Sequence, residues 1–236
     1  MNSIPSDTIY FLADMEDHEA RFKAFVNPLI GQQKQAIVFT PHIETIKKEV
    51  ELLKQKGINC AGYSSEVDYE IRDGIRDQFE NGEIQILYAT PLMYFVNREE
   101  FFPRFVRKQL SEGNLAYIVF DDAKFLYKYN FDGFGFHSYH DFAKLKDFAP
   151  NLHWKVIVDP VCREKLEEIS KILRLNEPTI NMALPTFSKL KSMESLGTLE
   201  NLEKVLKCSP LKQPVSRIVS QNVQLENLPK IEEIRN

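Results

Sequence analysis

The sequence has few cysteines, no long apolar run and no excess of basic residues. Its three cysteines, Cys60, Cys162 and Cys208, lie far apart, without a Cys-x-x-Cys pair or a nearby histidine, which excludes a disulfide-stapled scaffold and a zinc-finger arrangement. Near the N-terminus the apolar run is only five residues long and follows no basic segment, so we expect neither a signal peptide nor a membrane span. The formal net charge of −4 lacks the basic surplus that by itself indicates a nucleic-acid-binding protein. We expect a reducing, intracellular compartment.

What the sequence does have is a large apolar content: 43% of its residues are hydrophobic, with 17 Phe and 9 Tyr, as is typical of a folded protein. Between residue 8 and about residue 175, short β-branched and aromatic runs alternate with longer segments of helical period. This alternation predicts an α/β fold with a doubly wound, mostly parallel sheet. The predicted strands are residues 8–12, 35–40, 59–63, 84–89, 116–120 and 154–158, and the clearest amphipathic helices are residues 42–56 and 67–81.

The pattern weakens beyond residue 175, where prolines and scattered apolar residues replace it. We therefore predict one lobe over residues 1–183 and a weakly structured, partner-dependent tail over residues 184–236, in which residues 199–206 could form a short helix.

Several predicted strand ends carry strings that resemble the motifs of RecQ-type helicases of the second superfamily, in order and at similar spacing. The strings are residues 38–41, 57–65, 82–91, 116–124 and 138–150. The most specific is the string at 82–91, which ends in Tyr88-Ala89-Thr90-Pro91, although Leu92 stands where the family has Glu. The resemblance covers roughly residues 7 to 176 and implies a single RecA-like lobe, the first of the two motor lobes of such a helicase.

An ATP-hydrolysing first lobe places a Gly-rich loop with Lys and Ser or Thr after its first strand. Here residues 13–19 contain none of these types and instead carry Asp14, Glu16, Asp17, His18 and Glu19. Each carboxylate would repel a phosphate by on the order of 4 kcal/mol at about 4 Å. We expect no bound nucleotide or other cofactor. The same acids could simply start a helix, with Asp14 or Asp17 as its N-cap and Glu19 in its first turn, or could bind a metal ion.

The resemblance places Asp121 and Asp122 at the family's Asp-Glu-Ala-His box, with Lys124 in the position of its His. Asp122 is a shorter acid than the Glu that activates water there, so we interpret these residues as degenerate remnants. The alternative is a metal-dependent nuclease in which Asp121, Asp122 and Lys124 form half of the site, but the other half has no counterpart in the sequence.

An aromatic-rich segment follows, at the place of the loop that contacts single-stranded DNA in RecQ-type helicases. Its candidate binding residues are Phe125, Tyr127, Lys128, Tyr129, Phe131, Phe134, Phe136 and Tyr139. Three interpretations stay open: stacking of bases, anchoring of a protein partner, and burial of the rings in the protein's own core.

The sequence therefore predicts a catalytically inactive helicase-like domain that binds or scaffolds. We expect a protein partner, with single-stranded nucleic acid as a second kind of partner, and no small-molecule substrate. The resemblance suggests a nuclear DNA-repair, chromatin or RNA-silencing assembly. The alternative is a residual enzyme, either an ATPase or helicase subunit completed by another chain or a metal-dependent nuclease.

Overall fold

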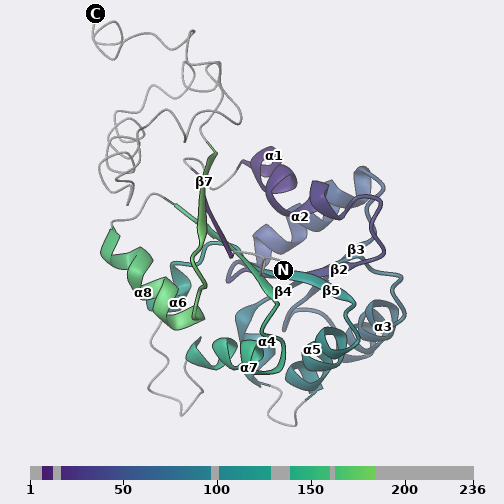
Figure 1. Cartoon of the computed structure of the whole chain (residues 1–236). Helices are drawn as coiled ribbons and strands as arrows, with labels where there is room; N and C mark the ends of the chain where they lie inside the picture. Colours follow the sequence, from purple (N-terminus) through teal and green to yellow (C-terminus); the bar gives the residue numbers. More distant parts are fainter. Residues whose placement is uncertain (1–6, 13–16, 97–100, 129–138, 160–162, 184–236) are drawn as a thin grey trace, which may run out of the picture.

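Parallel strands and the helices that connect them make up the described chain. The computed structural model describes residues 7–12, 17–96, 101–128, 139–159 and 163–183. The strands are β1 (Thr8–Leu12), β2 (Gln35–Phe39), β3 (Cys60–Tyr63), β4 (Ile86–Ala89), β5 (Leu115–Phe120), β6 (His153–Val158) and β7 (Thr179–Ala183). They form one sheet in the order β3-β4-β2-β5-β6-β1-β7, and each pair of neighbours is parallel (Figure 1). The predicted fold class is confirmed.

The connecting helices cover both faces of this sheet. They are α1 (His18–Arg21), the π-helical turn η1 (Phe22–Val26), η2 (Asn27–Leu29), α2 (Ile43–Gln55), α3 (Tyr69–Glu80), α4 (Pro91–Val96), α5 (Phe101–Ser111), α6 (Phe125–Lys128), η4 (Tyr139–Lys144), α7 (Leu145–Phe148) and α8 (Arg163–Leu173). The helices from α1 to α2 pack on one face, and α3 to α8 pack on the other. Both predicted helices, 42–56 and 67–81, are confirmed as α2 and α3.

Two apolar layers explain why the strands have nearly continuous hydrophobic sequences. In β2, Ala36 and Val38 pack toward α1 and α2, whereas Ile37 and Phe39 pack toward the opposite helices. Because successive side chains of a strand point to opposite faces, a sheet covered on both sides buries all of them. All five residues of β2 are buried.

The side chain of Asp7, before β1, bonds to residues that come much later in the sequence. Asp7, buried just before β1, accepts a backbone hydrogen bond from Trp154 at 3.0 Å and one from Asn176 at 2.7 Å. Its carboxylate also pairs with the ammonium group of Lys146 at 2.5 Å. The buried charge is thus compensated by three donors, as burial of a carboxylate requires.

A second buried lysine has no carboxylate partner among the residues that the structure describes. Lys155 on β6 donates to the carbonyl of Ala24 at 2.7 Å, and its Nζ lies 4.0 Å from the ring centroid of Tyr117 and 5.9 Å from that of Tyr10. Burial lowers the pKa of Lys155 from 10.5 to about 8.

The predicted tail, residues 184–236, and its suggested helix at 199–206 lie outside the described residues. Within the part of the chain that is described, none of the helices combines the length and the apolar character needed to cross a bilayer.

Candidate functional site

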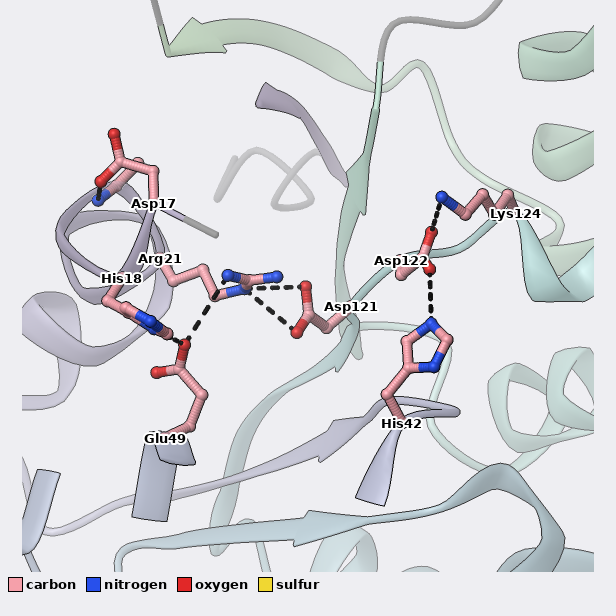
Figure 2. A network of polar contacts seen from close by, with 9 residues as sticks. Asp17, His18, Arg21, His42, Glu49, Asp121, Asp122 and Lys124 are labelled. Carbon is pink, nitrogen blue, oxygen red and sulfur yellow. Dashed lines mark hydrogen bonds and ion pairs between the residues drawn. The ribbon is translucent and has the colours of Figure 1, made fainter. Parts of the chain in front are cut away.

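The sheet has a topological switch point between its neighbouring strands β2 and β5. The chain leaves β2 through α2 toward β3 at one edge, and leaves β5 through α6 toward β6 in the opposite direction. In open parallel sheets the crevice at the carboxyl ends of two such strands is where ligands bind. His42 follows β2 here, and Asp121 and Asp122 follow β5 (Figure 2).

Asp121 belongs to a buried ionic cluster beneath this edge. Arg21 of α1 donates through Nε to both carboxylate oxygens of Asp121, at 3.2 Å each, and its Nη1 lies 3.7 Å from Oε1 of Glu49 on α2. The Glu49 carboxylate is also 2.5 Å from Nδ1 of His18 (Figure 2). We call Arg21, His18, Glu49 and Asp121 the buried cluster. It joins α1 and α2 to the residue after β5. Arg21, Glu49 and Asp121 are buried, and the His18 side chain is partly exposed.

The acidic residues after β1 start a helix, as one of the two interpretations predicted. The side chain of Asp17 accepts a hydrogen bond from the backbone N–H of Ala20 at 3.0 Å and is the N-cap of α1. Such a cap satisfies one of the free amide groups of the first turn. His18 and Arg21 of the same helix both contact Glu49. Asp14 and Glu16 lie outside the described residues.

Burial dominates the electrostatics of this cluster. It raises the pKa of Asp121 above its usual value, while the guanidinium of Arg21 opposes the rise. Burial also raises the pKa of Tyr88 well above its ordinary value, with help from the nearby carboxylates of Glu49 and Asp121. Among the described residues, the Tyr88 hydroxyl has no hydrogen-bond partner. The charged groups of the cluster therefore lie in an apolar environment, and Arg21 is the cation that stabilises the carboxylate of Asp121.

Asp122 faces away from the buried cluster and makes separate contacts. Its backbone has φ of 58°, a left-handed conformation that is uncommon outside glycine and turns the chain sharply after β5. One carboxylate oxygen lies 3.0 Å from Nε2 of His42, and the other lies 3.3 Å from Nζ of Lys124 as an ion pair without hydrogen-bond geometry. Lys124 donates in turn to Asp159 at 3.3 Å. We call His42, Asp122, Lys124 and Asp159 the crevice chain.

This arrangement separates the residues that the nuclease interpretation would bring together. Asp121 and Asp122 point in different directions, one to Arg21 and the other to His42 and Lys124 (Figure 2). Two acids that hold one metal ion must instead direct their oxygens to a common point. Within the described residues, no group of three His, Cys, Asp or Glu side chains is placed to hold a metal ion.

The start of the aromatic segment contributes to the core. Phe125 is fully buried in the layer of α3 to α8, so its predicted role in binding is wrong and core packing, the third interpretation, applies to it. Tyr127 is partly buried against the same layer, and the ammonium group of Lys165 lies 4.9 Å from its ring centroid. The side chains of Lys128 and Tyr139, and all of Tyr129, Phe131, Phe134 and Phe136, lie outside the described residues.

With this geometry established, comparison with known proteins points to one kind of lobe. Residues 20–94, roughly a third of the chain, match the helicase conserved C-terminal domain. A search of curated proteins gave no match.

Solved structures extend the likeness to the fold. The C-terminal domain of S. cerevisiae Dbp5, solved bound to Gle1, has 12% identity and a TM-score of 0.50, and the match covers 84% of this chain and 98% of that one. Domain 2 of the DEAD-box helicase Mss116p, solved bound to an RNA duplex, has 13% identity and a TM-score of 0.51, covering 85% of this chain and 70% of that one. The chain spans only 28% of the Pyrococcus furiosus Hef helicase domain, at 18% identity and a TM-score of 0.43. The fold is that of a RecA-like helicase lobe.

The domains matched in these comparisons are second lobes, whereas the sequence resemblance implied a first lobe. The matching model describes the C-terminal domain, and the Dbp5 and Mss116p structures are a C-terminal domain and a domain 2. They give no support to the RecQ subfamily. A Gly-rich phosphate loop belongs to the first lobe, so in a second lobe its absence from residues 13–19 would not indicate that ATP chemistry was lost.

The sequence identified Asp121, Asp122 and Lys124 but missed Arg21, Glu49 and His42. A signal for Glu49 was present, since it falls three residues after Ile46 and four before Leu53, on the apolar stripe of α2. An acid at such a position must find a buried partner. No comparable signal marks Arg21, because the partner it requires is a hundred residues away.

Proposed function

We propose that this chain is a helicase-type second lobe that binds partners and does not take part in ATP hydrolysis. The observation that carries the proposal is that the chain's own carboxylates neutralise both Arg21 and Lys124, the cations at the carboxyl edge among the described residues. A lobe that completes a nucleotide cleft supplies a cation, commonly an arginine, to the transferred phosphate.

Releasing Arg21 for such a role would be costly. It would leave the buried carboxylates of Asp121 and Glu49 without their cation, and breaking a buried pair in this way costs about 3–5 kcal/mol. Lys124 is more accessible, but it is shared between Asp122 and Asp159. The pairing of both cations supports a structural role for them.

Binding by an isolated second lobe has precedent in the neighbouring structures. One of them is bound to the protein Gle1 and another to an RNA duplex. For this chain we propose a protein partner first and nucleic acid second, within an intracellular, nuclear assembly. A tagged full-length chain imaged in cells tests the location, and exclusion from the nucleus would contradict it.

The test of inactivity is titration calorimetry of the full chain with ATP–Mg²⁺, alone and with an oligothymidylate strand. We expect no heat beyond dilution in either case. Binding in the micromolar range contradicts the proposal.

A second candidate is a lobe that completes the ATP cleft of another chain or of a longer protein. It is favoured by the match to the C-terminal domain of helicases, which work with two lobes. The full chain would be captured with its partners, and ATPase activity compared between the wild type and Lys124→Gln. Activity that Lys124→Gln abolishes would establish this candidate in place of the first.

Nucleic-acid binding is tested on the aromatic segment by fluorescence anisotropy. If Tyr127, Tyr129 and Phe131 stack bases, their replacement by Ala weakens single-strand binding, since each stacked base contributes about 1–3 kcal/mol. Tyr69→Ala, at an exposed tyrosine of α3, is the matched control. An unchanged affinity in the triple variant removes this role.

A further inference from the structure

β3 is an open edge of the sheet. It pairs with β4 on one side, and among the described residues no strand pairs with it on the other. The carbonyl groups of Asn59 and Tyr63 accept hydrogen bonds from the β4 side. In a parallel ladder the intervening residues point the other way, so the N–H and C=O groups of Cys60 and Gly62 face outward.

A groove runs along this edge between two helices. It has a volume of about 680 Å³ and is formed by the end of α2, by β3 itself and by α3. α2 and α3 lie on opposite faces of the sheet, so they flank the strand from both sides (Figure 1). Ile58, Val67, Ile71 and Ile75 supply apolar walls, and Ile71 is 56% exposed.

Open backbone groups between apolar walls form the site that an added β-strand requires. An extended segment gains affinity from main-chain hydrogen bonds to the edge strand, and its alternate side chains fill the pockets on either side. Folded proteins usually cover or charge such an edge, because it otherwise recruits other chains. Here the residues of α3 that line the groove, Ile71, Ile75 and Gln78, are uncharged, and the charged lining residues are Lys54 and Glu83.

We propose that residues 215–223 of this chain, which lie outside the described residues, add to β3 as an extra strand in this groove. In residues 184–236, Ile218 and Val219 are the one pair of adjacent β-branched residues, and the stretch from 215 to 223 holds a single charge, Arg217. β-branched residues favour strands. Because neighbouring side chains of a strand point to opposite sides, Ile218 and Val219 meet the α2 wall and the α3 wall of the groove.

The length of the intervening chain suits this distance. β7 and β3 lie at opposite edges of the sheet, six strand spacings of about 4.8 Å or roughly 29 Å apart. About 30 residues separate Ala183 from residue 215, and a flexible chain of that length has an end-to-end distance of roughly 30 Å. The local concentration of a tethered ligand is highest when its linker matches the span in this way.

The test measures amide hydrogen exchange of the full chain by NMR, at the outward N–H groups of Cys60 and Gly62. With the strand in place, we expect both to exchange at least about tenfold more slowly than in the variants Ile218→Asp and Ile71→Asp. Ile231→Asp is the matched control in the tail. Ile30→Asp is the matched control on the lobe, since Ile30 is 50% exposed and lies outside the groove.

Each outcome decides the proposal. Slow exchange that is independent of protein concentration and is lost in both test variants, but in neither control, supports it. Fast exchange in the wild type shows that the edge is open and overturns it. Protection that grows with protein concentration assigns the groove to a second copy, and protection that survives Ile218→Asp assigns it to another segment. Either of these results overturns the proposal as well.

Discussion

Replacing Lys155 by Met is expected to stabilise the protein at neutral pH. The ammonium group lies in an apolar layer, held by the carbonyl of Ala24 and the ring of Tyr117. The fall of its pKa from 10.5 to about 8 corresponds to about 3 kcal/mol of destabilisation of the charged form. Met keeps the length of the side chain but gives up the contact with the ring, which is worth about 0.5–2 kcal/mol. We therefore expect a net gain of about 1–2 kcal/mol at pH 7.

The pH dependence has a definite sign. Between pH 8 and 10.5 the unfolded chain keeps the Lys155 proton while the folded chain loses it, so the wild type gains stability as the pH rises. Below pH 8 both states carry the proton, and the full penalty remains. The advantage of Lys155→Met is thus complete at about pH 7 and shrinks steadily as the pH rises through about 9.

Urea unfolding followed by fluorescence measures this difference, because Trp154 is the protein's one tryptophan and is buried in the core. Lys171→Met, at an exposed lysine of α8, is the control and should change stability by less than about 0.5 kcal/mol at any pH. An advantage of Lys155→Met that stays constant between pH 7 and 9, or a loss of stability at pH 7, would refute the reasoning.

Three further changes test the fold and the buried cluster in the same urea assay. Arg21→Met should cost about 3–5 kcal/mol at neutral pH and less at acidic pH, because burial raises the pKa of Asp121 and its protonation removes the unpaired charge. An equal loss at both pH values would contradict this. Gly62→Ala puts a Cβ 2.7 Å from Cγ2 of Ile46 and should cost about 1–3 kcal/mol, with less than additive loss when combined with Ile46→Ala. Asp17→Ala removes the N-cap of α1 and should cost about 1 kcal/mol, whereas no change would show that α1 is held by the buried cluster alone.

The fold could be predicted from the sequence because its strands are buried on both faces. Six short apolar runs, each separated by a helical period, identify β1 to β6. β7 was missed, since Thr179–Ala183 mixes polar and apolar residues and pairs only with β1, at an edge of the sheet. The formation of such a strand depends more on pairing with the neighbouring strand than on its own hydrophobic pattern.

The site was predicted only in part. Short sequence motifs locate residues at strand ends, but they do not show which distant residues those side chains contact. Asp121 and Asp122 were found from their place at a strand end, but their opposite directions depend on the left-handed turn at Asp122. Phe125 was named as a candidate binding residue within an aromatic run, with burial as one of three interpretations, and the layer above the sheet buries it. The strand-end strings indicated a first lobe, whereas the domains matched in the comparisons are second lobes.

The position of β1 has a consequence for synthesis of the chain. β1 is the first of the described strands to be synthesised, and it pairs with β6 and β7, the last two of them. The residues that bond to β1 and to the carboxylate of Asp7 are therefore synthesised about 150 residues later. Until β6 and β7 are synthesised, β1 lacks both of these partner strands, and an unpaired apolar strand is prone to mispairing. A nascent fragment that ends before β6 contains the adjacent strands β3, β4, β2 and β5, but lacks β6, the strand that joins β5 to β1.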